Sequence, residues 1–251
     1  MTKNNAIPVK DIGSDHWFVS LLDLLRDKAK VLYLNTALQK LISIKLVEDK
    51  TSGLVSTFRD VGVPIFILTS RGGTEAYEVI TLEQLKQVGV ADALYQSDQN
   101  SRIPFKVDYE GRPNDREYAV YRNGVIFCHG MDKGECLRAF LKMMNRADQY
   151  IVMVDDNEQH LRRIEIALKN ICQSFTGLHY TALAPRIADF KLKVALQYLP
   201  ENFYVHLKPE EQVIVDELLI IHAQRTATNG TDASDETRHT RLTTSLPQAR
   251  K

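Results

Sequence analysis

The chain has 251 residues, of which 44% are apolar, so it is long enough for one large α/β domain or for a domain with a smaller cap. Its 32 Lys and Arg residues balance its 32 Asp and Glu residues. This balance excludes the global basic field that is typical of proteins that bind nucleic acid.

Cysteine usage and hydropathy bear on the compartment. Cys128, Cys136 and Cys172 form no Cys-x-x-Cys pair, so neither a disulfide framework nor a zinc knuckle is expected. No apolar run reaches the roughly 18 residues of a membrane span, and the polar residues 1–10 contain no signal-peptide core. The sequence as written therefore predicts a cytoplasmic protein, and it gives no indication of an oligomeric state.

The first third of the chain predicts helices followed by a strand. Residues 15–47 have the apolar spacing of helices, and residues 51–61 predict a short helix. Residues 63–68 are a continuous apolar run, typical of a strand buried on both faces of a parallel sheet. After a polar loop, Thr81 and Gln84 have the spacing of a capping box for a helix that runs to residue 89.

The remainder alternates strands with helices. Residues 97–124 predict a long loop or hairpin insertion, 125–127 a strand, and Asp132 the N-cap of a helix. Residues 151–154 predict a second buried strand with a helix after it, 179–183 one more strand, and 187–199 and 210–222 closing helices. This alternation predicts an α/β fold with a parallel sheet. Residues 225–251 are polar and predict a disordered tail.

Polar residues stand where these predicted strands end or helices begin. Thr69 follows the first strand, Lys133 begins the helix after Asp132, and Asp155 and Asp156 follow the strand at 151–154. Open α/β sheets bind their ligands at such positions. A hydroxyl and an ammonium suit phosphate oxygens, and adjacent carboxylates suit Mg²⁺. The sequence therefore predicts a phosphoryl site with Thr69 and Lys133 on phosphate and Asp155 and Asp156 on the metal.

Each of these residues also has an ordinary structural interpretation. A Thr at a strand end commonly forms a turn, a Lys in a first helical turn is commonly solvated, and an Asp before a helix serves as its N-cap. The adjacent pair is more informative, because two neighbouring carboxylates repel each other unless something binds them. His129 is interpreted as a loop residue, His160 as solvent-facing, and Cys128 and Cys136 as packing residues.

In this order the motifs resemble those of the haloacid-dehalogenase-like (HAD-like) superfamily. The stretch IFILTSR at residues 65–71 is similar to motif two, GMDKG at 130–134 to motif three, and VMVDDN at 152–157 to motif four. The stretch GSDHWF at 13–18 further resembles an uncharacterised phosphatase-like family of intracellular bacteria. The resemblance covers roughly residues 13–200.

The resemblance implies a Rossmann-like core with a small helical cap. Residues 1–50 would form the cap region, 51–224 the core and 225–251 the tail. Thr69 and Lys133 would bind the phosphate of a phosphorylated substrate, Asp155 would be the main Mg²⁺ ligand, and Asp156 would lie close to it. The implied activity is hydrolysis of phosphate monoesters, with the substrate unidentified.

The chain departs from the superfamily at motif one. The nucleophile there is the first Asp of Asp-x-Asp-x-Thr after a strand, and no such motif is present. Asp11 has the wrong spacing and no apolar strand before it. Either Met1 is an internal methionine of a longer protein, which fits the spacing to Gly13, or the chain is a pseudophosphatase that binds phosphate without catalysis. The first is the preferred hypothesis.

Two other functions are weighed against this one. A response-regulator receiver domain has its acidic pair first and its lysine last, which is the reverse of the order here. An interaction protein could use the basic residues of the tail against an acidic partner, but a solvated end explains that composition more simply.

Overall fold

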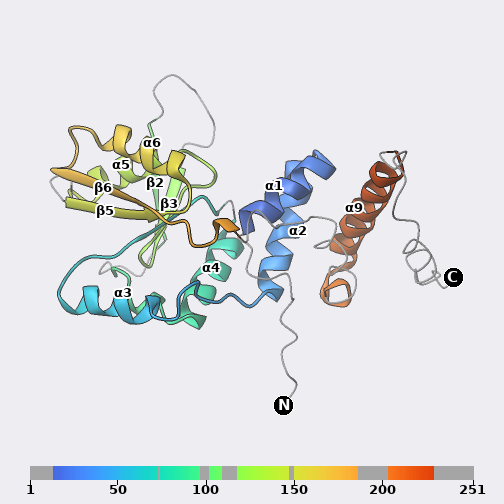
Figure 1. Ribbon diagram of the computed structural model, residues 1–251, viewed down its shortest axis with the longest axis horizontal. Helices are drawn as coiled ribbons and strands as arrows, with labels where there is room; N and C mark the ends of the chain where they lie inside the picture. Colours follow the sequence, from blue (N-terminus) through green and yellow to red (C-terminus); the bar gives the residue numbers. More distant parts are fainter. Residues whose placement is uncertain are drawn as a thin grey trace, which may run out of the picture. The chain divides into compact units, whose positions relative to one another are not determined.

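The computed structural model describes residues 14–72, 74–96, 102–108, 118–146, 150–185 and 203–228. The chain divides into two compact units, one of residues 1–13 and 38–190 and the other of residues 14–37 and 191–251 (Figure 1). The sequence analysis instead drew its boundaries after residues 50 and 224. The helix predicted at 187–199 and the tail from residue 229 lie outside the described residues.

The second unit consists of helices. Residues 15–47 do not form one helix, because Arg26 has a positive φ of 54° between α1 (Ser14–Leu25) and α2 (Lys28–Leu41). The Asp27 carboxylate then accepts hydrogen bonds from the first amides of α2. Apolar side chains of α1, of α2 and of α9 (Pro209–Thr228) are buried in this unit; they are Leu21, Leu24, Val31, Leu34, Val215 and Leu218.

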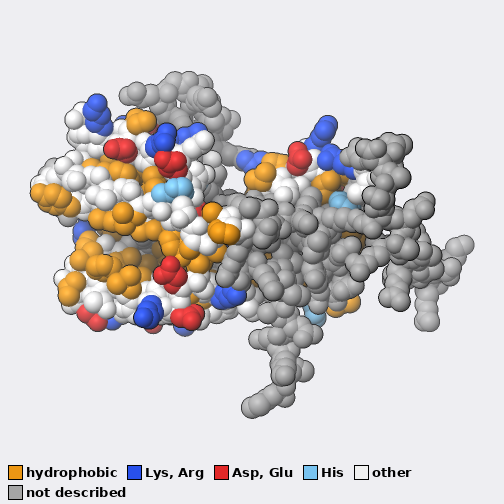
Figure 2. Space-filling model, in the orientation of Figure 1, with side chains coloured by type: hydrophobic (Ala, Val, Ile, Leu, Met, Phe, Trp, Pro, Cys, Tyr) orange, Lys and Arg blue, Asp and Glu red, His pale blue; other side chains and the backbone are white. Residues whose placement is uncertain are grey.

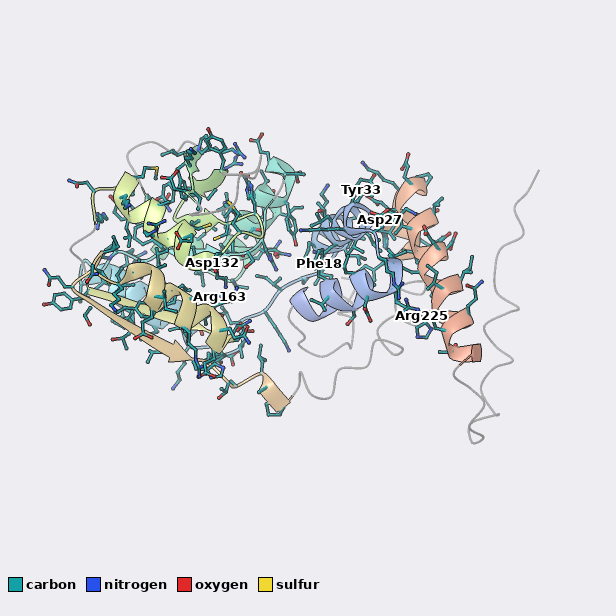
Figure 3. The ribbon with its side chains drawn as sticks, turned by 90° about the horizontal axis from the view of Figure 1, so that it is seen from above. Phe18, Asp27, Tyr33, Asp132, Arg163 and Arg225 are labelled. Carbon is teal, nitrogen blue, oxygen red and sulfur yellow. The ribbon has the colours of Figure 1, made fainter. Side chains whose placement is uncertain are left out.

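The end of α9 corrects the predicted start of the tail. The helix continues to Thr228, and a guanidinium nitrogen of Arg225 donates a hydrogen bond to the Asp23 carbonyl at 3.0 Å. Arg225 is labelled near the end of α9 in Figure 3. Composition alone placed the end of this helix too early. A polar segment such as the end of α9 can remain helical when its side chains bond to residues elsewhere, as Arg225 does.

The first unit contains a four-stranded mixed sheet with the order β1-β4-β3-β2. Strand β1 (Ile67–Thr69) is parallel to β4 (Val125–Phe127), which is the strand predicted at 125–127. Strands β2 (Ile103–Lys106) and β3 (Tyr118–Arg122) are antiparallel, as the hairpin alternative for residues 97–124 requires. The α/β class is therefore confirmed, with a sheet that is mixed rather than wholly parallel.

A second, two-stranded sheet pairs β5 (Tyr150–Asp155) in parallel with β6 (Ser174–His179). The strand predicted at 179–183 is wrong, because β6 ends where that prediction begins. The Tyr180 amide donates to the Asp155 carbonyl, and a turn then closes from Ala184 to Thr181. β6 was missed because its two apolar residues, Phe175 and Leu178, are three positions apart and do not follow the period-2 alternation of a strand.

Side-chain caps fix where three helices of this unit begin. Asp132 caps α5 (Lys133–Met143) as predicted, accepting from the amides of Gly134 and Glu135. Asn157 caps α6 (Glu158–Leu168), and Thr74 caps α4 (Glu75–Gln87). A further helix, α3 (Thr51–Asp60), precedes the sheet in the chain.

The capping box predicted at Thr81 and Gln84 is wrong, because both residues lie inside α4. Thr81 Oγ1 donates to the Tyr77 carbonyl at 3.0 Å, and the Gln84 amide donates to the Gln39 carbonyl at 3.0 Å. The cap lies almost two turns earlier, at Thr74. A Ser or Thr inside a helix bonds back to the preceding turn instead of capping it.

Helices α5 and α6 pack side by side and cover one side of both sheets (Figure 1). The ring of Phe140 on α5 is fully buried, with ring centroids of Phe66 and Tyr121 both 5.2 Å away. The same apolar cluster includes Leu68 of β1 and Met153 of β5. One core therefore holds both sheets of this unit.

Glycine lets the first turn of α5 approach α6 closely. A Cβ at Gly134 would lie 2.8 Å from the Arg163 carbonyl oxygen and 2.9 Å from the Ala167 Cβ. Gly134→Ala is expected to lower the free energy of unfolding by about 1–3 kcal/mol, because these neighbours are backbone and helix rather than flexible ends. Gly53→Ala in α3 is the control. With nothing within 4 Å, it should stabilise by up to about 1 kcal/mol. Urea unfolding followed by circular dichroism measures both, and equal effects would contradict the close-packing account.

Strand β5 is buried less than predicted. Tyr150, Val152 and Val154 are 77%, 66% and 57% exposed on one face, so the prediction of burial on both faces is wrong. Residues 63–66 likewise precede β1 instead of belonging to it. In Figure 2 hydrophobic side chains gather at the surface over β5, β6 and α3. The sequence sets how apolar a strand is, whereas its burial depends on what covers the sheet.

None of the helices in the described ranges combines the length and apolar character needed to cross a membrane.

Candidate functional site

The structure brings Lys133 and Asp155 together. Lys133 Nζ lies 2.7 Å from Asp155 Oδ2, and both side chains are largely buried. Lys133 begins the helix after β4, and Asp155 is the last residue of β5. This ion pair brings the start of the helix after β4 to the carboxyl end of β5, although the two strands belong to different sheets. The sequence analysis expected both residues in one site.

The Asp155 side chain is 4% exposed, and both of its oxygens are engaged. Its Oδ1 accepts a hydrogen bond from the Asn157 amide at 2.9 Å and lies 3.3 Å from His160 Nδ1. Burial by itself raises the pKa of Asp155, but the Lys133 ammonium, the Asn157 amide and His160 outweigh burial and hold this pKa below its ordinary value. Asp155 is therefore a carboxylate at neutral pH.

His160 corrects its sequence interpretation, because it faces Asp155 rather than solvent alone. It lies in the first turn of α6, where side chains point back toward the helix N-terminus. That direction brings its ring to the residue that ends β5. The cap at Asn157 was the available signal, since it fixes the helix start and thereby the direction of the His160 side chain.

Thr69 is the last residue of β1, which is the parallel neighbour of β4. It pairs in register with Phe127, its carbonyl accepts from the Cys128 amide at 2.8 Å, and its hydroxyl oxygen accepts from the Arg71 amide at 3.1 Å. The hydroxyl proton is not used by that last bond and is available to a phosphate oxygen. Thr69 thus lies at the end of the strand beside β4, with its side chain bonded to its own loop.

Asp156 is exposed, and its backbone carbonyl lies 3.2 Å from His179 Nε2. In the described part of the chain no group of three or more His, Cys, Asp or Glu side chains gathers to hold a metal. Mg²⁺ sites commonly use only one or two carboxylates, with water and substrate phosphate as the other ligands. Asp155 and Asp156 supply carboxylate oxygens of this kind, and both oxygens of Asp155 are engaged within the chain.

The N-terminus of α5 is already neutralised by its cap. Asp132 accepts two amide hydrogen bonds with Oδ1, and its Oδ2 lies 3.6 Å from Arg163 of α6. Figure 3 labels both residues on neighbouring helices. The positive end of the helix dipole therefore acts on Asp132 first, and Lys133 is the main cationic group of the candidate site.

A buried ionic cluster was missed by the sequence analysis. The Glu78 side chain of α4 is 0% exposed and accepts two hydrogen bonds from Arg102, at 2.8 and 2.9 Å. Arg122 lies 3.6 Å and His129 3.7 Å from the same carboxylate. These residues are 24 to 51 positions away from Glu78 along the chain, so no local spacing pattern connects them.

Cys128 and Cys136 are fully buried free thiols, which confirms their interpretation as packing residues. Contact with the Cys128 thiol, together with burial, raises the pKa of Cys136. Burial beside Cys128 therefore disfavours the thiolate form of Cys136, which is the form that acts as a nucleophile.

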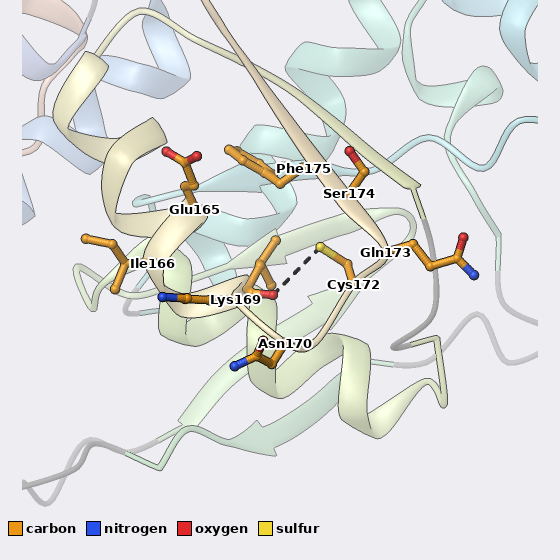
Figure 4. Close-up of a pocket in the computed structure, with 9 residues that line it drawn as sticks. Glu165, Ile166, Lys169, Asn170, Cys172, Gln173, Ser174 and Phe175 are labelled. Atoms are coloured by element: carbon orange, nitrogen blue, oxygen red, sulfur yellow. Dashed lines mark hydrogen bonds between the residues drawn. The ribbon is translucent and has the colours of Figure 1, made fainter.

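A surface hollow of about 440 Å³ lies between the C-terminal end of α6 and the start of β6 (Figure 4). Its wall includes Glu165, Lys169, Cys172 and Phe175. Ser174 pairs with Tyr150, whereas Asp155 pairs with His179. The hollow is therefore at the opposite end of these strands from Asp155 and is separate from the candidate site.

Comparisons with known proteins bear on the family of this chain. Neither the curated proteins nor the solved structures include a match. Residues 6–201 match the family described as "Protein of unknown function (DUF2608)". This match includes Thr69, Lys133, Asp155 and Asp156, and it extends over more than half of the 251 residues. The chain therefore belongs to the family of proteins of unknown function DUF2608.

Proposed function

We propose that this chain carries the phosphate- and Mg²⁺-binding side of a HAD-like phosphomonoester hydrolase. The observation that carries the proposal is the 2.7 Å pair of Lys133 and Asp155 at the end of β5. A buried lysine and a buried carboxylate with a lowered pKa, at the carboxyl edge of parallel strands, are suited to bind a phosphate together with its cation.

Different residues of the chain would bind the phosphate and the metal. Two protons of the Lys133 ammonium are not used by Asp155, and they can donate to phosphate oxygens together with the Thr69 hydroxyl. Asp155 and Asp156 would hold Mg²⁺, which supplies charge neutralisation to the phosphoryl group when bound. His160 and the Asn157 amide keep the Asp155 carboxylate in one orientation.

The Rossmann-like core is part of the proposal. Among the described residues, β1 pairs only with β4, and β5 pairs only with β6. A strand hydrogen-bonded to the free edges of both β1 and β5 would join the two sheets into one. It would end at the same edge as Thr69 and Asp155, where the superfamily has its nucleophilic aspartate. Hydrolysis requires such a strand with Asp-x-Asp-x-Thr, which this sequence does not contain.

The second candidate function is phosphate binding without catalysis. It is favoured by the missing nucleophile motif and by the complete hydrogen bonding of Asp155 within the chain itself. Intact mass of the protein from its own cells separates the two functions. A mass above that of the 251 residues supports the hydrolase, with Asp155→Asn then expected to abolish phosphomonoester turnover without unfolding. An equal mass supports the binding protein.

Calorimetric titration with inorganic phosphate tests the binding that both functions share. The chain should bind phosphate more tightly with MgCl₂ than without it. Lys133→Gln should weaken binding at least about tenfold, because a charged hydrogen bond contributes roughly 1.5–3 kcal/mol. Lys142→Gln, at an exposed lysine of the same helix, is the control and should leave the affinity unchanged. No phosphate binding, or equal losses in both variants, would overturn the proposal.

A further inference from the structure

The buried cluster around Glu78 is close in the chain to the loops of the proposed phosphate site, although it shares no residue with that site. Glu78 is held by two hydrogen bonds from Arg102 and faces Arg122 and His129 at 3.6 and 3.7 Å. Of these residues, His129 alone belongs to a loop that carries a site residue. It stands four positions before Lys133, between β4 and α5.

Three backbone hydrogen bonds tie the His129 loop to the loop after β1. The amides of Cys128, His129 and Gly130 donate to the carbonyls of residues 69, 71 and 70 at 2.8, 3.3 and 3.0 Å. The first of these carbonyls belongs to Thr69. The two loops therefore move together, and a shift of residues 128–130 would displace both Thr69 and Lys133.

The His129 ring lies between Gly72, in the loop after β1, and the Glu78 carboxylate. A Cβ at Gly72 would lie 2.1 Å from His129 Cδ2, so only glycine admits the ring at this place. His129 Nε2 is buried and has no hydrogen-bond partner within the described residues. Burial lowers the pKa of His129, which keeps the imidazole neutral at pH 7.

The backbone of His129 is in the left-handed region, with a φ of 53°. Residues with a Cβ seldom take this conformation, and Asn, Asp and His tolerate it better than most others. The turn therefore admits a histidine but does not require one in preference to Asn. The ring of His129, which lies against Gly72 and Glu78, is the feature that Asn would lack.

We infer that His129 is a positioning residue of the proposed phosphate site, whose ring sets the loops of Thr69 and Lys133 against the buried Glu78 carboxylate. The inference rests on the proposed function. His129 would act through geometry, because its ring lies beside Glu78 and its backbone amide binds the loop that carries Thr69. The specific content is that a polar side-chain end must lie beside the Glu78 carboxylate, where His129 Nε2 is 3.7 Å from Glu78 Oε1.

Two uncharged substitutions in the full chain separate side-chain reach from backbone conformation. His129→Gln retains an N–H near the Nε2 position but is less suited to the left-handed turn. His129→Asn suits the turn better but is too short to approach Glu78. Amide ¹H–¹⁵N shifts of residues 69–71 and 130–134 report the loop positions without any ligand. Titration with inorganic phosphate in MgCl₂ reports the site.

His129→Gln should keep the parent shifts and a phosphate affinity within about twofold, whereas His129→Asn should shift these amides and weaken phosphate binding at least about fivefold. The far-ultraviolet spectrum of both variants should match that of the parent. Parent-like behaviour of the Asn variant, or equal losses in both, would overturn the inference. Absence of phosphate binding in the parent would instead refute the proposed function, and the amide shifts would still decide the role of His129.

Discussion

Replacement of Glu78 with glutamine is expected to lower the free energy of unfolding of the first unit by about 3 kcal/mol. This value is at the lower end of the range for a broken buried ion pair, because Arg102 is 37% exposed and keeps part of its hydration. The variant leaves Arg102 and Arg122 beside an uncharged amide. The loss is larger for Arg122, because within the described residues its Nη1 is buried without a hydrogen bond and its nearest carboxylates are those of Glu75 at 3.5 Å and Glu78 at 3.6 Å.

Native-state hydrogen exchange of β3 and β4 amides measures this loss within the first unit. Fluorescence would not, because the single tryptophan, Trp17, belongs to the second unit. Glu75→Gln is the matched control. Its carboxylate is 68% exposed, so its removal should cost no more than about 0.5 kcal/mol. If both variants lose the same small amount, Glu78 does not hold the cluster together.

Lys133→Met has the other large expected effect, a loss of roughly 3–5 kcal/mol at pH 7, because it leaves the buried Asp155 carboxylate without its cation. Asp155→Asn in the same chain should restore much of this loss, since the remaining pair is then uncharged. A double-mutant cycle by urea unfolding measures the coupling. Additive losses from the two substitutions would show that the ion pair contributes nothing to folding.

The stability lost in the Lys133→Met variant is expected to depend on pH in a definite direction. In the parent, the pKa of Asp155 is lower in the folded than in the unfolded chain, whose value is about 3.9. The ionised group therefore stabilises the fold above that value, and this contribution is lost as the pH falls through the folded pKa. Without Lys133, burial should raise the folded pKa. The stability difference between parent and variant should therefore shrink as the pH falls from 7 toward about 4.

That Lys133 and Asp155 lie in one site could be predicted from sequence because it follows from fold class. Their direct ion pair was not predicted, since Lys133 was assigned to phosphate and Asp155 to Mg²⁺. Polar residues after strands of a parallel α/β sheet meet at one edge, so Lys133 and Asp155 were placed together before any coordinates. Glu78 could not be connected with Arg102 or His129 in this way. Their meeting depends on the position of α4 relative to the residues before β2 and after β4, which no spacing along the chain encodes.

Errors in the fold have equally specific causes. Thr81 and Gln84 have the spacing of a cap, but Thr74 starts the helix and makes Thr81 an internal residue. The apolar strand β5 was read as buried, yet among the described residues no element covers the face of Tyr150 and Val154. Local sequence patterns thus predicted which segments are helices and strands. The residue at which a helix starts and the burial of a strand depend on residues distant in the chain.

Among the described residues β5 pairs only with β6, and this has a consequence for the behaviour of the protein in concentrated solution. Residues 150–154 are five consecutive uncharged β-formers, with three side chains exposed on one face and no proline to interrupt them. Such a segment is a template for cross-β stacking between molecules. Aggregation during overexpression would therefore start at this strand. A lysine at Val152 would be the substitution that suppresses it with least disturbance of the core.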